Sequence, residues 1–163
     1  MNVFDEFKHL VAELETQKVR YALVGVVALA YLNHCHWLLG EEAQAAHAGQ
    51  EALDLAEKVD VPMTSCYALG RASWQAAFSC NSEAAGLHAE RLLLISRQHG
   101  FRNYELGACF LLAWVEAHAG GSALAQVEPM YQAMQDYENL GTRLNRTTFL
   151  ILFTQVCAQA GQL

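Results

Sequence analysis

The stretch YALGRASWQAAFSCNSEAAGLHAERLLLISRQHGF, residues 67–101, decides the fold, because the rest of the chain repeats its plan. In it, an apolar-rich run ends at Cys80 and an Ala-rich amphipathic run follows. At a spacing of about 40 residues, similar apolar runs end at Gly40, Gly120 and Gly161. A fixed period of this length is typical of stacked helical hairpins, in which each unit buries its apolar face only against its neighbours.

This pattern predicts an all-α, right-handed solenoid of helical hairpins with about eight helices. Short breaks separate the hairpins, at Val59–Pro62, His99–Arg102 and Leu140–Arg143. The expected helices are Asn2–Gln17, Val19–Leu39, Glu41–Val59, Met63–Ser79, Ser82–His99, Asn103–Ala119, Ser122–Leu140 and Leu144–Ala160. Ser82 is the expected N-cap of its helix and Gly100 the expected C-cap. Pro129 predicts either a kink or a later start in the helix that contains it.

The expected organisation is a single domain, 1–163. Residues 1–18 form a capping helix, whose apolar stripe consists of Phe4, Phe7, Val11 and Leu14. The hairpin repeats are 19–62, 63–102 and 103–143, and an unpaired helix, 144–163, follows them. When the repeats are aligned, Leu29, Leu69, Cys109 and Leu150 share one column, and Leu32, Ala72, Leu112 and Phe153 share another. These columns are small or apolar, as packing between adjacent hairpins requires.

Composition narrows the class of partner. The formal net charge is −7, with 10 basic against 17 acidic residues, which argues against a nucleic-acid surface. The longest apolar run, Tyr21–Leu32, is too short to span a bilayer, and Asp5 and Glu6 argue against a signal peptide. The five cysteines form no C-x-x-C pair and lie in apolar runs, which favours free thiols in a reducing cytoplasm, with no disulfide and no metal.

Residues 25–162 resemble the tetratricopeptide-like repeats at the C-terminal end of bacterial ATPase-type transcriptional regulators and cyclase-linked signalling ATPases. The stretches that carry the resemblance are ALAYLNHCHWLLGEEAQAA (28–46), EALDLAEKVDVP (51–62), YALGRASWQAAF (67–78), HAERLLLISRQHGF (88–101) and ENLGTRLNRTTFLILFTQVCAQAGQ (138–162). The resemblance implies a tetratricopeptide-like scaffold. It implies no catalytic function, because the chain carries neither the ATPase of those regulators nor a DNA-binding or cyclase domain.

Three chemical alternatives are weaker. VRYALVGVVALAYL (19–32) is similar to the opening of minimal nucleotidyltransferases, but Val26 follows Gly25 and no Asp-x-Asp pair follows to hold magnesium. In NHCHW (33–37), His34 and His36 point about 200° apart on a helix, so they cannot share one metal. No local signature accompanies any cysteine as a catalytic nucleophile.

The repeat register predicts which side chains line a concave groove, because the first helix of each hairpin faces it in such solenoids. Trp74 and Trp114 share one column, and aromatic rings are favoured at binding surfaces. The same rings could instead fill the core, since one residue of register error turns a side chain by about 100°. The candidate groove residues are His34, Trp37, Tyr67, Trp74, Phe78, Phe110, Trp114 and His118, followed by Ile151 and Gln155.

These features favour a non-catalytic scaffold that binds a peptide or a helix, or that associates with itself. An alternative is a small-molecule sensor, which would enclose its effector in one cavity. Five consecutive large apolar residues, 149–153, would point all around a helix that one neighbour cannot cover. They predict a homodimer through the C-terminal helix, with Phe149, Ile151, Leu152 and Phe153 at its interface.

Overall fold

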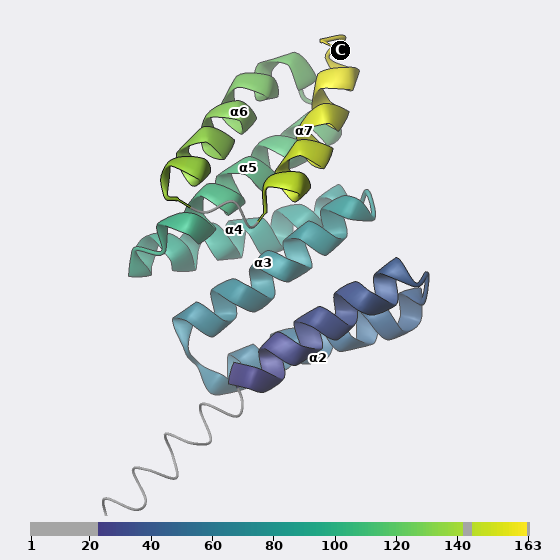
Figure 1. The fold of residues 1–163 in the computed structure, drawn as a ribbon, viewed down its shortest axis with the longest axis vertical. Coiled ribbons are helices and arrows are strands. Elements are labelled where there is room, and N and C mark those ends of the chain that lie inside the picture. The colour runs from purple at the N-terminus through teal and green to yellow at the C-terminus, as the bar shows by residue number, and fades with distance from the viewer. Residues whose placement is uncertain (1–22, 142–144, 163) are drawn as a thin grey trace, which may run out of the picture. The chain divides into compact units, whose positions relative to one another are not determined.

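The computed structural model describes residues 23–141 and 145–162, and every regular element in these ranges is an α-helix (Figure 1). The prediction of an all-α chain is therefore confirmed for these residues. Residues 23–38 are helical, and six helices follow: α2 (Glu42–Val59), α3 (Pro62–Phe78), α4 (Ser82–His99), α5 (Arg102–His118), α6 (Ala123–Asn139) and α7 (Arg146–Gln159). The expected helix Asn2–Gln17 lies outside the described residues.

The helices end at regular intervals. Every described residue with a positive φ follows a helix: Gly40, Asp60, Cys80, Gly100, Gly120, Gly141 and Gly161, each 20 or 21 residues after the one before. After the first helix of each hairpin the same hydrogen bond recurs: the N–H groups of residues 41, 81, 121 and 162 donate to the carbonyl oxygen five residues earlier, at 2.9–3.1 Å. This bond is the long one of the Schellman motif, which satisfies a free carbonyl at the helix end. The spacing of helix ends that the sequence predicts is thus present in the backbone.

α4 begins at Ser82, as predicted, and the starts of α2, α3, α5, α6 and α7 differ from prediction by a residue or two. Asn81, and not Ser82, caps α4, because its side chain accepts a hydrogen bond from the Ala84 N–H at 3.0 Å. Ser122, expected inside α6, is its N-cap and accepts from the Ala125 N–H. Pro62, expected in a break, is the first residue of α3, a position where the missing N–H costs nothing. Gly100 is the C-cap of α4, as predicted.

Pro129 does not delay the start of α6, which is one helix from Ala123 to Asn139. Proline has no N–H to offer the carbonyl of Ala125, one turn earlier. Both residues are exposed, so water can bind that carbonyl instead. The helix therefore tolerates a proline in its interior.

The chain divides into two compact units, the first ending at Ala68 and the second beginning at Leu69. In the first unit, helix 23–38 packs against the alanine-rich face of α2. A Cβ built on Gly25 would lie 3.0 Å from Leu55 Cδ2, so the two helices approach closely there. The buried Asn33 Nδ2 donates to the carbonyl oxygen of Ala45 at 2.7 Å.

The second unit is built around α5, which packs against α4, α6 and α7. Phe110, Leu111 and Trp114 of α5 are fully buried. Their neighbours in this core are small on one side and large on the other: Ala85 and Ala89 of α4, Met130 and Tyr137 of α6, and Phe149, Leu152 and Val156 of α7. Small residues on α4 allow it to lie close to α5.

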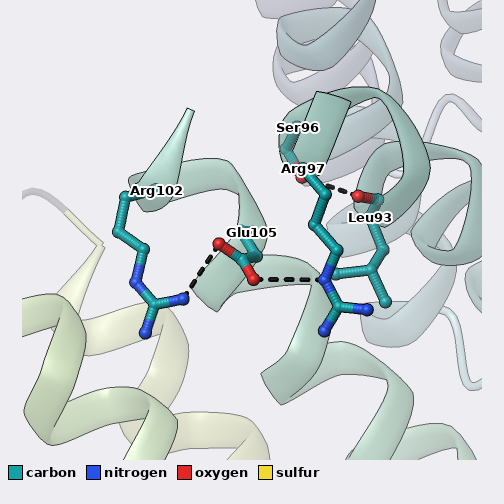
Figure 2. Close-up of polar contacts among 5 residues, drawn as sticks. All are labelled: Leu93, Ser96, Arg97, Arg102 and Glu105. Atoms are coloured by element: carbon teal, nitrogen blue, oxygen red, sulfur yellow. Dashed lines mark hydrogen bonds and ion pairs between the residues drawn. The ribbon is translucent and has the colours of Figure 1, made fainter. Parts of the chain in front are cut away.

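An ion-pair network braces the turn between α4 and α5. The Glu105 carboxylate accepts from Arg97 Nε at 3.1 Å and from Arg102 Nη1 at 2.9 Å (Figure 2). These hydrogen bonds, of which the one from Arg102 has the largest effect, hold the pKa of Glu105 below its usual value. The equivalent pair, 41 residues on, joins Glu138 to Arg146 Nε at 3.2 Å with the charges exchanged. One pair connects the end of α4 to the start of α5, and the other connects the end of α6 to the start of α7.

Candidate interaction surface

The predicted groove residues of the second unit form two adjoining groups on α3, α5 and α7. The first group is aromatic. The half-buried Trp74 lies 5.7 Å from Phe110 between ring centroids, and Phe149 contacts both rings edge-on, at 5.1 and 4.6 Å. Phe78 is also half-buried and packs against the same core. The edge-on geometry is favourable for aromatic pairs, so this group stabilises the packing of α5 against α7.

Burial corrects four of the predicted positions. Phe110 and Trp114, predicted to line a groove, have no exposed surface and belong to the core. Phe149 and Leu152, predicted at a dimer interface, are 1% and 0% exposed within a single chain. Their side chains are covered because α7 packs on both α6 and α5, which the sequence argument did not anticipate.

The apolar surface that α7 leaves exposed is smaller than predicted. Leu150 is 40% exposed, Ile151 is 45% exposed and Phe153 is half-buried, 6.3 Å from the Tyr131 ring. Self-association through α7 stays a prediction, and the side chains available for it are these three.

The second group is a polar cluster that joins α5 to α7, formed by Trp114, His118, Gln155 and Gln159. The imidazole of His118 stacks on the Trp114 indole, with the ring centroids 4.0 Å apart. Trp114 Nε1 donates to Gln155 Oε1 at 3.3 Å, and His118 Nε2 lies 3.0 Å from Gln159 Nε2. Each of these hydrogen bonds spans 41 residues, so equivalent positions of successive first helices are paired.

The chemistry of the partners fixes which atoms carry hydrogen. Nδ1 of His118 lies 2.9 Å from the Trp114 carbonyl oxygen, which can only accept, so Nδ1 carries the proton. In the neutral ring Nε2 is then an acceptor, and Gln159 Nε2 donates to it. Indole N–H can only donate, so the oxygen of Gln155 faces Trp114.

Within the described residues, this assignment leaves the side-chain NH2 group of Gln155 as a donor and the side-chain oxygen of Gln159 as an acceptor for a ligand. Among the described residues, no hydrogen bond uses the side-chain nitrogen Nε2 of Gln155 or the side-chain oxygen Oε1 of Gln159. The two residues are four apart on α7 and therefore lie on one face of it. Gln155 is half-buried and Gln159 is exposed, so both can be reached from solvent. A donor and an acceptor on one helix face match the C=O and N–H groups of a peptide.

The predicted groove residues of the first unit lie apart from this cluster in the sequence. His34 and Trp37 are half-buried and stack on each other with ring centroids 6.1 Å apart. Tyr67 is half-buried and packs with Val26, Ala56 and Ala68. Sequence reasoning missed Gln159, although its position four residues after Gln155 and 41 after His118 was a usable signal.

Cys66 and Cys157 are buried and Cys109 is half-buried, whereas Cys35 and Cys80 are exposed. Burial raises the pKa of Cys66 to about 11, and it also raises the pKa values of Cys109 and Cys157. A thiol with a raised pKa is a poor nucleophile at neutral pH. No group of three or more His, Cys, Asp or Glu side chains that could hold a metal occurs within residues 23–141 and 145–162.

Comparisons with known proteins add no relative: no family model, no curated protein and no solved structure matches this chain. Among the helices that the structure describes, none is both long and apolar enough to cross a membrane.

Proposed function

We propose that the chain is a non-catalytic interaction scaffold, a right-handed solenoid of tetratricopeptide-like hairpins that binds an extended peptide on the α5–α7 face. The solenoid is supported by the helix ends at 20- or 21-residue intervals and by the two ion pairs at equivalent turns. The pairing of equivalent residues on α5 and α7 supports stacking of successive hairpins in register.

The observation that carries peptide binding is the unused donor and acceptor of Gln155 and Gln159. Gln155 Nε2 would donate to a carbonyl oxygen of the peptide, and Gln159 Oε1 would accept from an N–H group. The half-buried rings of Trp74 and Phe78 lie on α3 of the same unit and would receive an apolar side chain. Main-chain hydrogen bonds give such recognition its affinity, and neighbouring apolar contacts give it specificity.

Two substitutions, and a control substitution, test this proposal on an array of immobilised random peptides. Gln155→Glu keeps an oxygen to accept from Trp114 but removes the amide donor, and Gln159→Ala removes the acceptor. We expect each to weaken the peptides that bind the unmodified chain by about 2- to 10-fold, the range of one hydrogen bond.

The matched control is Gln132→Ala on α6, whose amide donates to Asp136 at 2.9 Å on an exposed surface. It should leave peptide binding unchanged. Failure to bind any peptide, or equal losses in all three variants, would exclude the α5–α7 face as the binding surface.

A further inference from the structure

His118 lies between two hydrogen-bond partners of different chemistry. Its ring nitrogen Nδ1 is 2.9 Å from the Trp114 carbonyl oxygen, and its Nε2 is 3.0 Å from Nε2 of Gln159. A carbonyl oxygen only accepts, whereas the side-chain amide of glutamine has an accepting oxygen and a donating nitrogen. The contact with Trp114 is therefore the same for the neutral and the protonated ring, but the contact with Gln159 depends on which end of the amide faces His118.

Protonation of His118 reverses what its Nε2 requires from Gln159. In the neutral ring, Nε2 accepts from the Gln159 NH2 group. In the protonated ring both nitrogens carry hydrogen, so the Nε2–H group would meet an NH2 group that cannot accept. A half-turn of the amide about its last side-chain bond exchanges its nitrogen and oxygen and restores the hydrogen bond. Gln159 is exposed, which leaves room for this rotation.

No charged side chain among the described residues takes the place of Gln159. The end of α5 lies beside the first turns of α4, because a Cβ built on Gly86 would be 3.4 Å from Val115 Cγ1. None of the acidic, basic or histidine side chains in the facing halves of the neighbouring helices forms an ion pair with His118. On α3 to α6 these side chains are Arg71, Glu83, His88, Glu90, Glu116 and Glu128, and residues 153–159 of α7 include none. Gln159 is therefore the group that responds when the ring gains a proton.

We propose that protonation of His118 inverts the Gln159 side-chain amide and thereby changes the ligand that the α5–α7 face selects. In the neutral state the face offers the Gln155 nitrogen as a donor and the Gln159 oxygen as an acceptor, which suit a peptide group. In the protonated state both glutamines offer donors, which suit the two oxygens of a carboxylate. The change of ligand rests on the proposed function, whereas the inversion itself needs no peptide.

The preceding hairpin supplies a matched variant. Phe78 of α3 lies 40 residues before His118 and packs half-buried against the core of the second unit. His118→Phe therefore introduces a flat ring that the repeat already uses at this position, and this ring can neither titrate nor accept from Gln159. Gln132 of α6, whose amide donates to Asp136, serves as the internal reference.

Nuclear magnetic resonance of the free, ¹⁵N-labelled chain tests the inversion. Histidine ordinarily changes its charge between about pH 5 and about pH 8. At the upper end we expect a ¹⁵N–¹⁵N scalar coupling between Gln159 Nε2 and His118 Nε2 across their hydrogen bond. The coupling should disappear at the lower end, because the Gln159 oxygen then faces the ring, and it should do so with the midpoint of the His118 ring signals.

The side-chain signals of Gln132 should stay in place over this range, and in His118→Phe those of Gln159 should stay in place as well. A coupling that persists after the His118 ring has been protonated would overturn the proposal. A His118 ring that does not titrate in this range would overturn it too.

The change of ligand is tested with array-selected peptides that bind at about pH 8 and that Gln159→Ala weakens. We expect their affinity to fall by about 2- to 10-fold at about pH 5, the range of one hydrogen bond, because their N–H group then meets the Gln159 NH2 group. The affinity of His118→Phe should be the same at both pH values, and an equal fall in this variant would overturn the change of ligand. Inversion in a chain that binds no peptide would support the switch and exclude the proposed function, so the two fail separately.

Discussion

Trp114 connects the core of the second unit to its polar surface. Its ring has no exposed area, yet its Nε1–H reaches Gln155 and its face stacks on His118. A buried indole needs a hydrogen-bond acceptor, and Gln155 supplies it at the edge of the core. Trp114, which the sequence register predicts to line a groove, therefore lies in the core and contacts the more exposed Gln155 and His118.

Replacement of the two tryptophans should separate these roles. Trp114→Ala removes a fully buried side chain and should lower the free energy of unfolding by about 3–5 kcal/mol. Trp74→Ala removes a half-buried ring and should cost clearly less. Urea denaturation of both variants, followed by circular dichroism, measures the difference. A larger loss for Trp74→Ala would contradict the burial of Trp114.

The residue scale also shows why the candidate site was only partly predictable. An apolar column at helical spacing is produced equally by a core and by a binding groove, so the column of Trp74 and Trp114 could not distinguish them. Polar residues within such columns are more informative, because a half-buried amide needs partners. The register placed Gln155, Phe110 and Trp114 in the groove alike, but only Gln155 keeps exposed surface in the structure.

At the scale of the helix, prediction was accurate to one or two residues for the described helices. Gly40, Cys80, Gly120 and Gly161 end apolar runs in the sequence and adopt positive φ in the structure. The bounds of α4, Ser82–His99, match the prediction, but its N-cap is Asn81 and not Ser82. Both are good N-cap residues, and the sequence alone does not choose between them. The burial of α7 side chains against α5 depends on contacts between segments that are distant in the sequence, and no local pattern encodes such contacts.

Replacement by alanine should change stability in opposite directions at two glycines of the second unit. A Cβ at Gly107, inside α5, and one at Gly120, after it, would each have no heavy atom within 4 Å, so neither change is limited by space. Gly107→Ala should raise stability by up to about 1 kcal/mol through helix propensity. Gly120→Ala should lower it by about 1–2 kcal/mol, because φ at Gly120 is +95°. Thermal melts of both variants decide this, and a stabilising Gly120→Ala would contradict the left-handed helix end.

At the scale of the whole chain, we interpret the structure as one plan used repeatedly. Helix ends at 20- or 21-residue intervals, ion pairs at equivalent turns and hydrogen bonds between equivalent residues on α5 and α7 all repeat it. In such a plan the exposed side chains of the first helices are where one scaffold differs from another. For this chain they include two glutamine amides with an unused donor and acceptor, which is why we assign the peptide to α5 and α7.

The most direct test of that assignment is a titration of ¹⁵N-labelled protein with an array-selected peptide, followed through side-chain N–H resonances in nuclear magnetic resonance spectra. The account predicts that the Gln155 and Gln159 amide signals and the Trp114 indole signal shift together and saturate, while the Gln132 amide on α6 stays in place. Saturating shifts at Gln132 with unchanged signals at Gln155 and Gln159 would contradict it.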